Sequence, residues 1–221
     1  MIKAVVFDVG KVLVEWERDL PFRRLIPDAA QRAWFMETVI PLAWHGQHDA
    51  GRSAAQMVAE RSALFPDHAH LIAAWLSHFN ETIPGPVPGS EALVEALHAR
   101  GVPLYAITNF GADTWAGFAP TWRLYDRFID IVVSGDEKLA KPDPAIYALS
   151  AKRFGRAPET MLFIDDSLAN VESARRCGWH AHHFSDATTL RADLVERGLL
   201  GQATSHKATK SQRKPGSAEP M

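Results

Sequence analysis

Short apolar segments that end in a polar residue constrain the fold of this chain more than any other feature. Residues 5–7 are Val-Val-Phe, and Asp8 follows them directly. Three similar segments occur later in the chain, at 104–107, 129–133 and 161–164. Continuous apolar runs of this length are typical of strands that are buried on both faces of a parallel sheet.

Segments of helical length alternate with these strands and carry start and stop signals. Asp143 can cap a helix that has Pro144 in its first turn and ends at Gly155. Similar helices are expected over 90–100 and 167–177. Strands that alternate with such helices predict an α/β protein with a doubly wound parallel sheet.

Residues 15–87 interrupt this alternation. They contain no convincing buried strand but several helical patterns, including those at 29–40, 52–65 and 68–81. We therefore expect a helical cap domain at 15–87, inserted into a core domain made of residues 1–14 and 88–200. Residues 201–221 have almost no apolar side chains, and a segment of that composition is predicted to be a disordered tail.

Composition excludes several classes of protein. The 221 residues carry a formal net charge of only −2, so there is no basic field to hold nucleic acid. Cys177 is the only cysteine, which excludes an internal disulfide and fits a reducing compartment. No apolar run reaches the roughly 18 residues of a membrane span, and the first residues lack a secretory pattern. A cytoplasmic protein without nucleic-acid or membrane partners is expected; no oligomeric state follows.

Polar residues gather where the predicted strands end, and ligands of doubly wound sheets bind at that edge. These residues are Asp8, Thr108, Asn109, Lys141, Asp165 and Asp166. A carboxylate can attack phosphorus and form an aspartyl-phosphate. Lys141 and the Thr108 hydroxyl would hold the transferring oxygens. A hard cation such as Mg²⁺, held by carboxylate oxygens, would offset the repulsion between Asp8 and an anionic phosphate.

Four segments together resemble the motifs of the haloacid dehalogenase (HAD) superfamily. They read VFDVGKVL at 6–13, ITN at 107–109, KPDP at 141–144 and FIDDS at 163–167, and they occur in the order of that superfamily. The resemblance extends over about residues 1–200 and includes a helical insertion of the first cap class. It implies a Rossmann-like core and a hydrolase that acts on small molecules.

The resemblance also implies a role for each matching residue. Asp8 would be the nucleophile and a metal ligand. The other metal ligands would be the backbone carbonyl of Gly10 and the carboxylate of Asp166, with Asp165 close behind. The transferring phosphoryl group would be bound by Thr108, Asn109 and Lys141. A Mg²⁺-dependent phosphatase for small phosphorylated metabolites, sugar phosphates in particular, is the leading function.

One position departs from the commonest HAD pattern. Most HAD phosphatases have a second Asp two residues after the nucleophile as general acid and base, and this chain has Gly10 there. Bacterial sugar-1-phosphate phosphatases resemble it in this Asp-x-Gly start and in a cap stretch like 44–51. From that stretch we expect His45 and Trp44 at the substrate, and either His45 or Glu15 is a candidate proton donor.

Two alternatives to the phosphatase remain open at this stage. Haloacid dehalogenases also lack the second Asp, so Gly10 is compatible with a 2-haloacid dehalogenase. The acidic pair of Asp165 and Asp166 argues against it, because dehalogenation needs no metal and these carboxylates would repel a halocarboxylate. The second alternative is a non-catalytic HAD-like binding or regulatory protein that lost turnover through Gly10. The substrate itself cannot be named, because cap residues carry no transferable code.

Overall fold

The computed structural model describes residues 1–202, and the predicted disordered tail lies almost entirely outside them. Its centre is one five-stranded sheet in the order β3-β2-β1-β4-β5, with every neighbouring pair parallel. This arrangement confirms the predicted doubly wound α/β fold. The strands are β1 (Ala4–Phe7), β2 (Leu104–Thr108), β3 (Asp130–Val133), β4 (Met161–Asp165) and β5 (His180–His183).

The register of the sheet brings the predicted polar residues together. Phe7 in the central strand is paired with Ala106 of β2 on one side and with Ile164 of β4 on the other. The next residues, Asp8 and Asp165, therefore leave the sheet at the same edge. From β1 the chain builds strands to both sides, so this edge is the switch point at which such sheets bind ligands.

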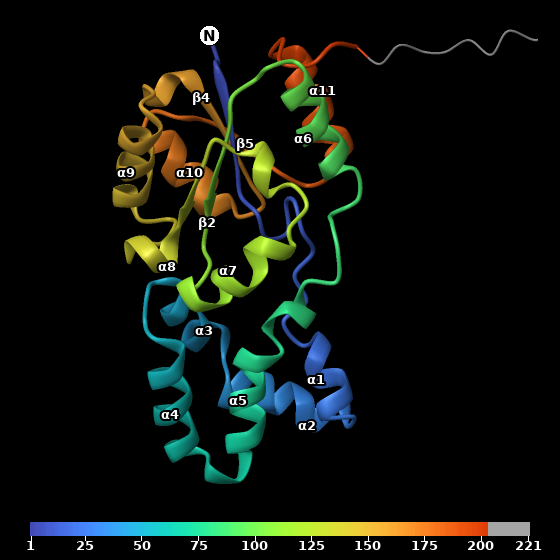
Figure 1. Cartoon of the computed structure of the whole chain (residues 1–221), viewed down its shortest axis with the longest axis vertical. Helices are drawn as coiled ribbons and strands as arrows, with labels where there is room; N and C mark the ends of the chain where they lie inside the picture. The colour runs from blue at the N-terminus through green and yellow to red at the C-terminus, as the bar shows by residue number, and fades with distance from the viewer. Residues whose placement is uncertain (203–221) are drawn as a thin grey trace, which may run out of the picture.

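Alternate residues of each strand face opposite helical layers, as the two-residue period of a strand requires. Val5 and Phe7 belong to a core with α6 (Ser90–Ala99), α7 (Ala112–Phe118) and α11 (Ala187–Glu196). Ala4 and Val6 belong to a core with α9 (Pro144–Phe154) and α10 (Leu168–Arg176). Figure 1 shows these two groups of helices on either side of the sheet.

A separate helical layer lies beyond the carboxyl ends of the strands, in the lower half of Figure 1. It has its own buried cluster, which includes Phe22, Phe35, Met57, Ile72 and Trp75. The cap limits predicted above enclose this layer and remain a prediction. Its helices are α1 (Leu20–Leu25), α2 (Ala29–Trp34), α3 (Leu42–Asp49), α4 (Ala54–Leu64) and α5 (Ala69–Ser77).

The helices of this layer differ in detail from the sequence expectation. The pattern at 29–40 is divided, because the chain changes at Phe35 from α2 to a π-helical segment, Phe35–Val39, whose buried side chains include Phe35 and Val39. The pattern at 68–81 likewise divides into α5 and a 3₁₀ segment, Phe79–Thr82. The short helices α1 and α3 lie outside the helical patterns named from the sequence.

Helix α3 connects the helical layer to the sheet. Ser134, at the start of α8 (Ser134–Glu137), donates its hydroxyl to the carbonyl of Asp49, with an oxygen–oxygen distance of 2.5 Å. The ring of His48 lies against Gly111, where a Cβ atom would overlap it. The end of α3 is thus fixed against the loops that follow β2 and β3.

We expect Gly111→Ala to destabilise the protein by about 1–3 kcal/mol, because an added methyl group would have to displace the His48 ring. Thermal unfolding followed by circular dichroism measures the effect. Gly117→Ala is the matched control, since Gly117 lies in α7 and its Cβ would meet only the Asn80 side chain at 4.0 Å. Equal melting temperatures for the two variants would contradict the tight contact at Gly111.

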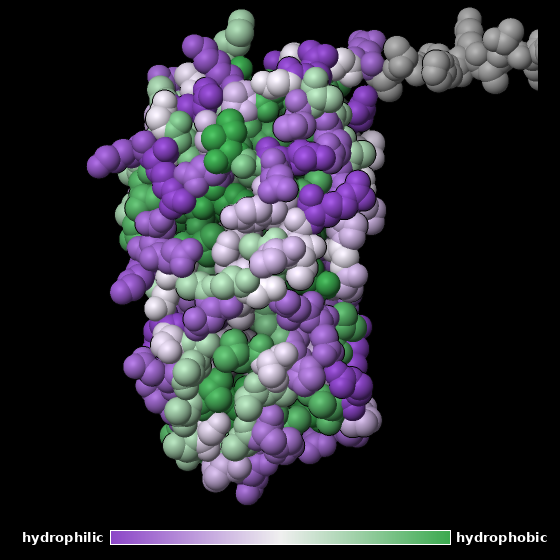
Figure 2. Space-filling model, viewed as in Figure 1, coloured by the Kyte–Doolittle hydropathy of each residue, from purple (hydrophilic) through white to green (hydrophobic). Residues whose placement is uncertain are grey.

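The described residues include no helix that is long and apolar enough to cross a membrane. Hydrophilic and apolar residues are intermixed over the face of the molecule in Figure 2, and the apolar patches on that face are interrupted by hydrophilic side chains.

Candidate active site

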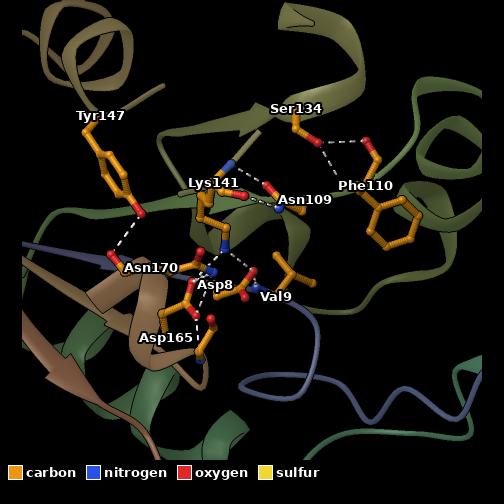
Figure 3. A network of polar contacts seen from close by, with 10 residues as sticks. Asp8, Val9, Asn109, Phe110, Ser134, Lys141, Tyr147, Asp165 and Asn170 are labelled. Carbon is orange, nitrogen blue, oxygen red and sulfur yellow. Dashed lines mark hydrogen bonds and ion pairs between the residues drawn. The ribbon is translucent and has the colours of Figure 1, made fainter. Parts of the chain in front are cut away.

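The ammonium group of Lys141 lies between two carboxylates at the carboxyl edge of the sheet (Figure 3). Its Nζ is 2.8 Å from Oδ1 of Asp8 and 2.7 Å from Oδ2 of Asp165. The side chains of Lys141 and Asp165 are almost completely buried, while that of Asp8 is 12% exposed. Charge-assisted contacts of this length in a buried site fix all three side chains relative to one another.

The loop that carries Lys141 is held by Asn109. The Asn109 amide donates to the Lys141 carbonyl and accepts from the Lys141 N–H, both at 2.8 Å. Two residues later, Asp143 caps α9 by accepting from the N–H of Ala145. Asn109 thus positions the backbone of Lys141, in addition to the phosphoryl contact expected of it.

Asp165 is surrounded by donors. Its Oδ1 accepts from the N–H of Ser167 at 2.8 Å, and Nδ2 of Asn170 lies 3.0 Å from both of its oxygens. Asn170 is itself fixed, because its carbonyl accepts from the hydroxyl of Tyr147 at 2.9 Å. With the Lys141 contact, these bonds occupy both oxygens of Asp165, so this carboxylate organises the site more than it offers free ligand atoms.

Asp8 and Asp166 have oxygens to spare. Oδ1 of Asp8 accepts from the N–H of Val9 at 2.7 Å and contacts Lys141, whereas among residues 1–202 no hydrogen bond is recorded to its Oδ2. Asp166 has no side-chain partner in the same range. The carboxylates of Asp8, Asp165 and Asp166 can each present an oxygen so that all three lie within 4.8 Å of one another. This is a set of hard oxygen donors of the kind that Mg²⁺ prefers.

The shifted pKa values indicate that the negative charges of this site exceed its positive charges. Burial raises the pKa of Asp8 above its usual range; Lys141 opposes this shift and Asp165 adds to it. Burial and the charge of Asp165 also raise the pKa of Asp166. Burial alone would lower the pKa of Lys141, but Asp165 and Asp8 raise it overall, so the ammonium stays charged. The three carboxylates outnumber the two nearby ammonium groups, Lys141 and Lys11, so a bound cation would stabilise the site.

A cavity of about 350 Å³ opens between this edge of the sheet and the helical layer. Asp8, Gly10, Asn109 and Asp166 form its floor, together with Lys11. Much of the remaining wall is apolar, from the side chains of Val14, Trp16, Leu42, Phe79, Ile83 and Phe110. Its volume is in the range of pockets for small organic molecules.

The other predicted site residues have different positions relative to this cavity. Thr108 is buried at the end of β2, next to the network, and His45 lines the cavity from α3. Trp44 packs inside the helical layer, with its ring centroid 4.6 Å from that of Trp75, and is not among the cavity-lining residues. Glu15 is not among them either, although its neighbour Trp16 is.

Sequence reasoning missed two charged residues of the cavity, Lys11 and Asp49. Lys11 directly follows Gly10, and its ammonium lies 5.6 Å from the ring centroid of Trp16. Asp49 ends α3, in the same cap stretch that drew attention to His45. The signal available in the sequence was the position of Asp49 four residues after His45, which places both on one helical face.

Comparison with known proteins gives a family and several relatives. The model of the haloacid dehalogenase-like hydrolase family matches residues 2–178. The phosphoglycolate phosphatase of Thiobacillus denitrificans is 27% identical over 186 residues, which is 80% of each chain. The sesquiterpene phosphatase astK of Aspergillus oryzae is 25% identical over 210 residues, covering 90% of this chain and 97% of the relative.

Solved structures share the fold. A HAD family enzyme from Bacteroides thetaiotaomicron, in complex with magnesium and inorganic phosphate, superimposes with a TM-score of 0.64 at 22% identity and covers 86% of this chain and 99% of its own. L-2-haloacid dehalogenase from Xanthobacter autotrophicus gives 0.61 at 17% identity, with 88% and 83% covered. At these identities the likeness concerns the fold alone.

Proposed function

The chain belongs to the haloacid dehalogenase-like hydrolase family, and on that basis we propose that it is a Mg²⁺-dependent phosphatase of small phosphate monoesters. Asp8 is the proposed nucleophile. The observation that carries the proposal is the position of Lys141, whose ammonium joins Asp8 and Asp165 at the floor of the cavity. The names of the two phosphatase relatives support the same reaction class.

The proposed first step is attack of Asp8 on the phosphorus atom. The Val9 N–H and the Lys141 ammonium hold Oδ1, which leaves Oδ2 free to form the new bond. The ester bond breaks and its electron pair remains on the departing oxygen. Water then attacks the aspartyl-phosphate, and inorganic phosphate and the Asp8 carboxylate are released. Throughout, Lys141 would neutralise the phosphoryl oxygens, with Thr108 and Asn109 as further donors.

The residues present fit a magnesium ion. Asp8 and Asp166 have carboxylate oxygens without side-chain hydrogen bonds among the described residues, and Gly10 lines the cavity beside them with its backbone. We propose Asp8, the Gly10 carbonyl and Asp166 as its protein ligands, with Asp165 behind them. When bound, the ion would supply the positive charge that three carboxylates and a phosphate require.

The cavity wall favours a particular kind of substrate. Sugars present many hydroxyl groups, and a site for them needs a matching number of buried donors and acceptors. Above the catalytic floor, the wall offers His45 and Asp49 among mostly aromatic and aliphatic side chains. We therefore propose monoesters with a largely apolar organic part, ahead of the sugar phosphates suggested by the sequence resemblance.

A substrate panel tests this function. We expect hydrolysis of phosphate monoesters with added Mg²⁺, with kcat/KM higher for phenyl or prenyl phosphates than for hexose phosphates, and no chloride release from 2-chloropropionate. Phosphate release and chloride release are measured with Mg²⁺ and with EDTA. Chloride release in the presence of EDTA would contradict the proposal and indicate a 2-haloacid dehalogenase. Binding of phosphate without any turnover would indicate the non-catalytic alternative.

A further inference from the structure

In this kind of site the carboxylate that transfers the proton usually stands two residues after the nucleophile. This chain has Gly10 at that position, and glycine has no side chain. Gly10 lines the cavity next to Asp8, and apart from Gly10 and its two chain neighbours no described residue has an atom within 4 Å of the place that a Cβ would occupy. An ester oxygen that leaves as a bare alkoxide is a poor leaving group, so another residue must supply a proton if alkyl esters are to react. That residue has to reach the same cavity.

Asp49 reaches this cavity from the opposite wall. It is the last residue of α3, its side chain is 17% exposed, and it lines the same space as Asp8, Gly10 and Asp166. A substrate whose phosphoryl group lies on Asp8 and whose organic part lies against the apolar wall would bring its ester oxygen between the two carboxyl groups.

Asp49 is held firmly in this position. Its carbonyl accepts from the Ser134 hydroxyl, and the Gly111 N–H acts on its carboxylate and lowers its pKa. The contact between His48 and Gly111 fixes the same turn of α3. A proton donor must have a defined place relative to the reacting oxygen. These contacts fix the place of Asp49 by joining it to residues at least 62 positions later in the chain.

The protonation state of Asp49 suits a group that both gives and takes a proton. Burial raises its pKa to about 7, against the opposing effects of the Gly111 N–H and the Lys141 ammonium. The titratable ring of His45 lies beside its carboxylate, with Nε2 at 3.6 Å from Oδ2. A carboxyl group that titrates near neutral pH is well matched to general acid and base catalysis.

The geometry argues against His45 as the donor itself. Its Nδ1 accepts from the indole N–H of Trp75 at 2.9 Å, so the ring holds one proton, on Nε2. Burial, together with Arg18 and His48, lowers the pKa of His45 to about 3. His45 therefore remains a neutral imidazole whose Nε2–H faces Asp49, and it acts as a positioning residue.

We propose that Asp49 replaces the missing carboxylate at position 10 as the proton donor and acceptor of the reaction, an inference that rests on the proposed phosphatase function. In the first step Oδ2 of Asp8 bonds to phosphorus, the P–O ester bond breaks, and the departing oxygen takes the proton of Asp49 and leaves as an alcohol. In the second step the Asp49 carboxylate takes a proton from the attacking water. The P–O bond to Asp8 then breaks, which returns both carboxyl groups to their starting states.

The test compares wild type with Asp49→Asn on esters with different leaving groups. For alkyl phosphates we expect kcat/KM to fall by about 10²–10⁴-fold. The leaving group of 4-nitrophenyl phosphate needs no proton, so in the variant Asp8 should still be phosphorylated by this ester. Hydrolysis of the aspartyl-phosphate should become slow. The variant should then show a burst of nitrophenol equal to the enzyme concentration. Asp67→Asn, an exposed carboxylate of the helical layer, is the matched control and should behave as wild type.

The pH profile gives a second readout. In wild type, kcat/KM for alkyl phosphates should decline as pH rises through about 7, where Asp49 loses its proton. Asp49→Asn should lack this decline. The charged and titratable groups that act on Asp49 are Lys141, from the loop before α9, and the adjacent His45, which stays neutral above its pKa of about 3.

A rescue experiment separates a catalytic role from a structural one. Space is open at Gly10, so a carboxylate can be introduced there. The double variant Gly10→Asp/Asp49→Asn should have an alkyl phosphatase activity at least tenfold higher than that of Asp49→Asn. A uniform loss for all esters, without a burst and without rescue, would overturn the role of Asp49. If the wild type itself hydrolyses no phosphate ester, the proposed function fails instead, so the two failures are distinguishable.

Discussion

Asp8→Asn is expected to lower turnover of phosphate esters at least about 10³-fold while the protein stays folded. The amide has the shape of the carboxylate but is a far weaker nucleophile. Its oxygen can still accept from the N–H of Val9 and from Lys141, which contact Oδ1 of Asp8 in the native site. Single-turnover kinetics with radiolabelled phosphate ester should also show that no protein-bound phosphate forms.

Two controls make this result interpretable. The melting temperature of Asp8→Asn should stay within a few degrees of wild type, and mass spectrometry should exclude conversion of the asparagine back to aspartate. Asp113→Asn, at an exposed carboxylate in the first turn of α7, is a comparison that should retain full activity. More than a few per cent of wild-type activity in a clean Asp8→Asn preparation would remove Asp8 from the nucleophile position.

The sheet and the floor of the site were predictable because they depend on local signals. A strand buried on both faces reads as a continuous apolar run, and parallel strands bring their carboxyl ends to one edge. Asp8 and Asp165 were placed correctly at such ends, and Asp143 caps its helix with the expected contact to Ala145. The family match over residues 2–178 confirms the resemblance that these motifs carried.

The upper half of the cavity was less predictable because it depends on contacts between distant residues. Helix α3 is only eight residues long and has no strong apolar stripe, so its pattern alone does not identify it. Its place follows from the bond between Ser134 and the Asp49 carbonyl, which joins residues 85 positions apart. The role of Trp44 at the substrate stays a prediction; its ring packs against that of Trp75 within the helical layer.

The charges of the floor bear on the choice between phosphatase and dehalogenase, because the fold does not decide it: a HAD family enzyme in complex with magnesium and phosphate and a haloacid dehalogenase both share it. Three carboxylates and the ammonium groups of Lys141 and Lys11 still leave an excess of negative charge unless a cation binds. A halocarboxylate would add a further negative charge and bring no cation with it. A phosphate ester is also an anion, but it is the ordinary partner of a site that holds Mg²⁺. The metal dependence is therefore the decisive property.

We expect EDTA to abolish phosphatase activity and added Mg²⁺ to restore it, with unequal contributions from the two adjacent aspartates. Asp166→Ala should weaken Mg²⁺ binding by more than about 100-fold, because it removes a carboxylate with no other side-chain partner among residues 1–202. Asp165→Ala should weaken binding by about 10–100-fold, the usual effect of a residue that orients the ligands. Calorimetric titration of Mg²⁺ into each variant measures the difference.

Without metal, the two variants should differ in thermal stability in the opposite order: Asp165→Ala should be destabilised more than Asp166→Ala. Asp165 is fully buried and accepts from Lys141, Ser167 and Asn170, so its removal leaves a buried ammonium with only Asp8 as partner. Losing one member of a buried ion pair typically costs about 3–5 kcal/mol. Asp166 is half-buried and supports no such network, so Asp166→Ala should melt close to wild type. Equal losses of Mg²⁺ affinity and equal melting temperatures for both variants would contradict the assignment of Asp166 as a metal ligand and of Asp165 as the residue that orients the site. A larger metal loss in Asp165→Ala would instead make Asp165 the direct ligand.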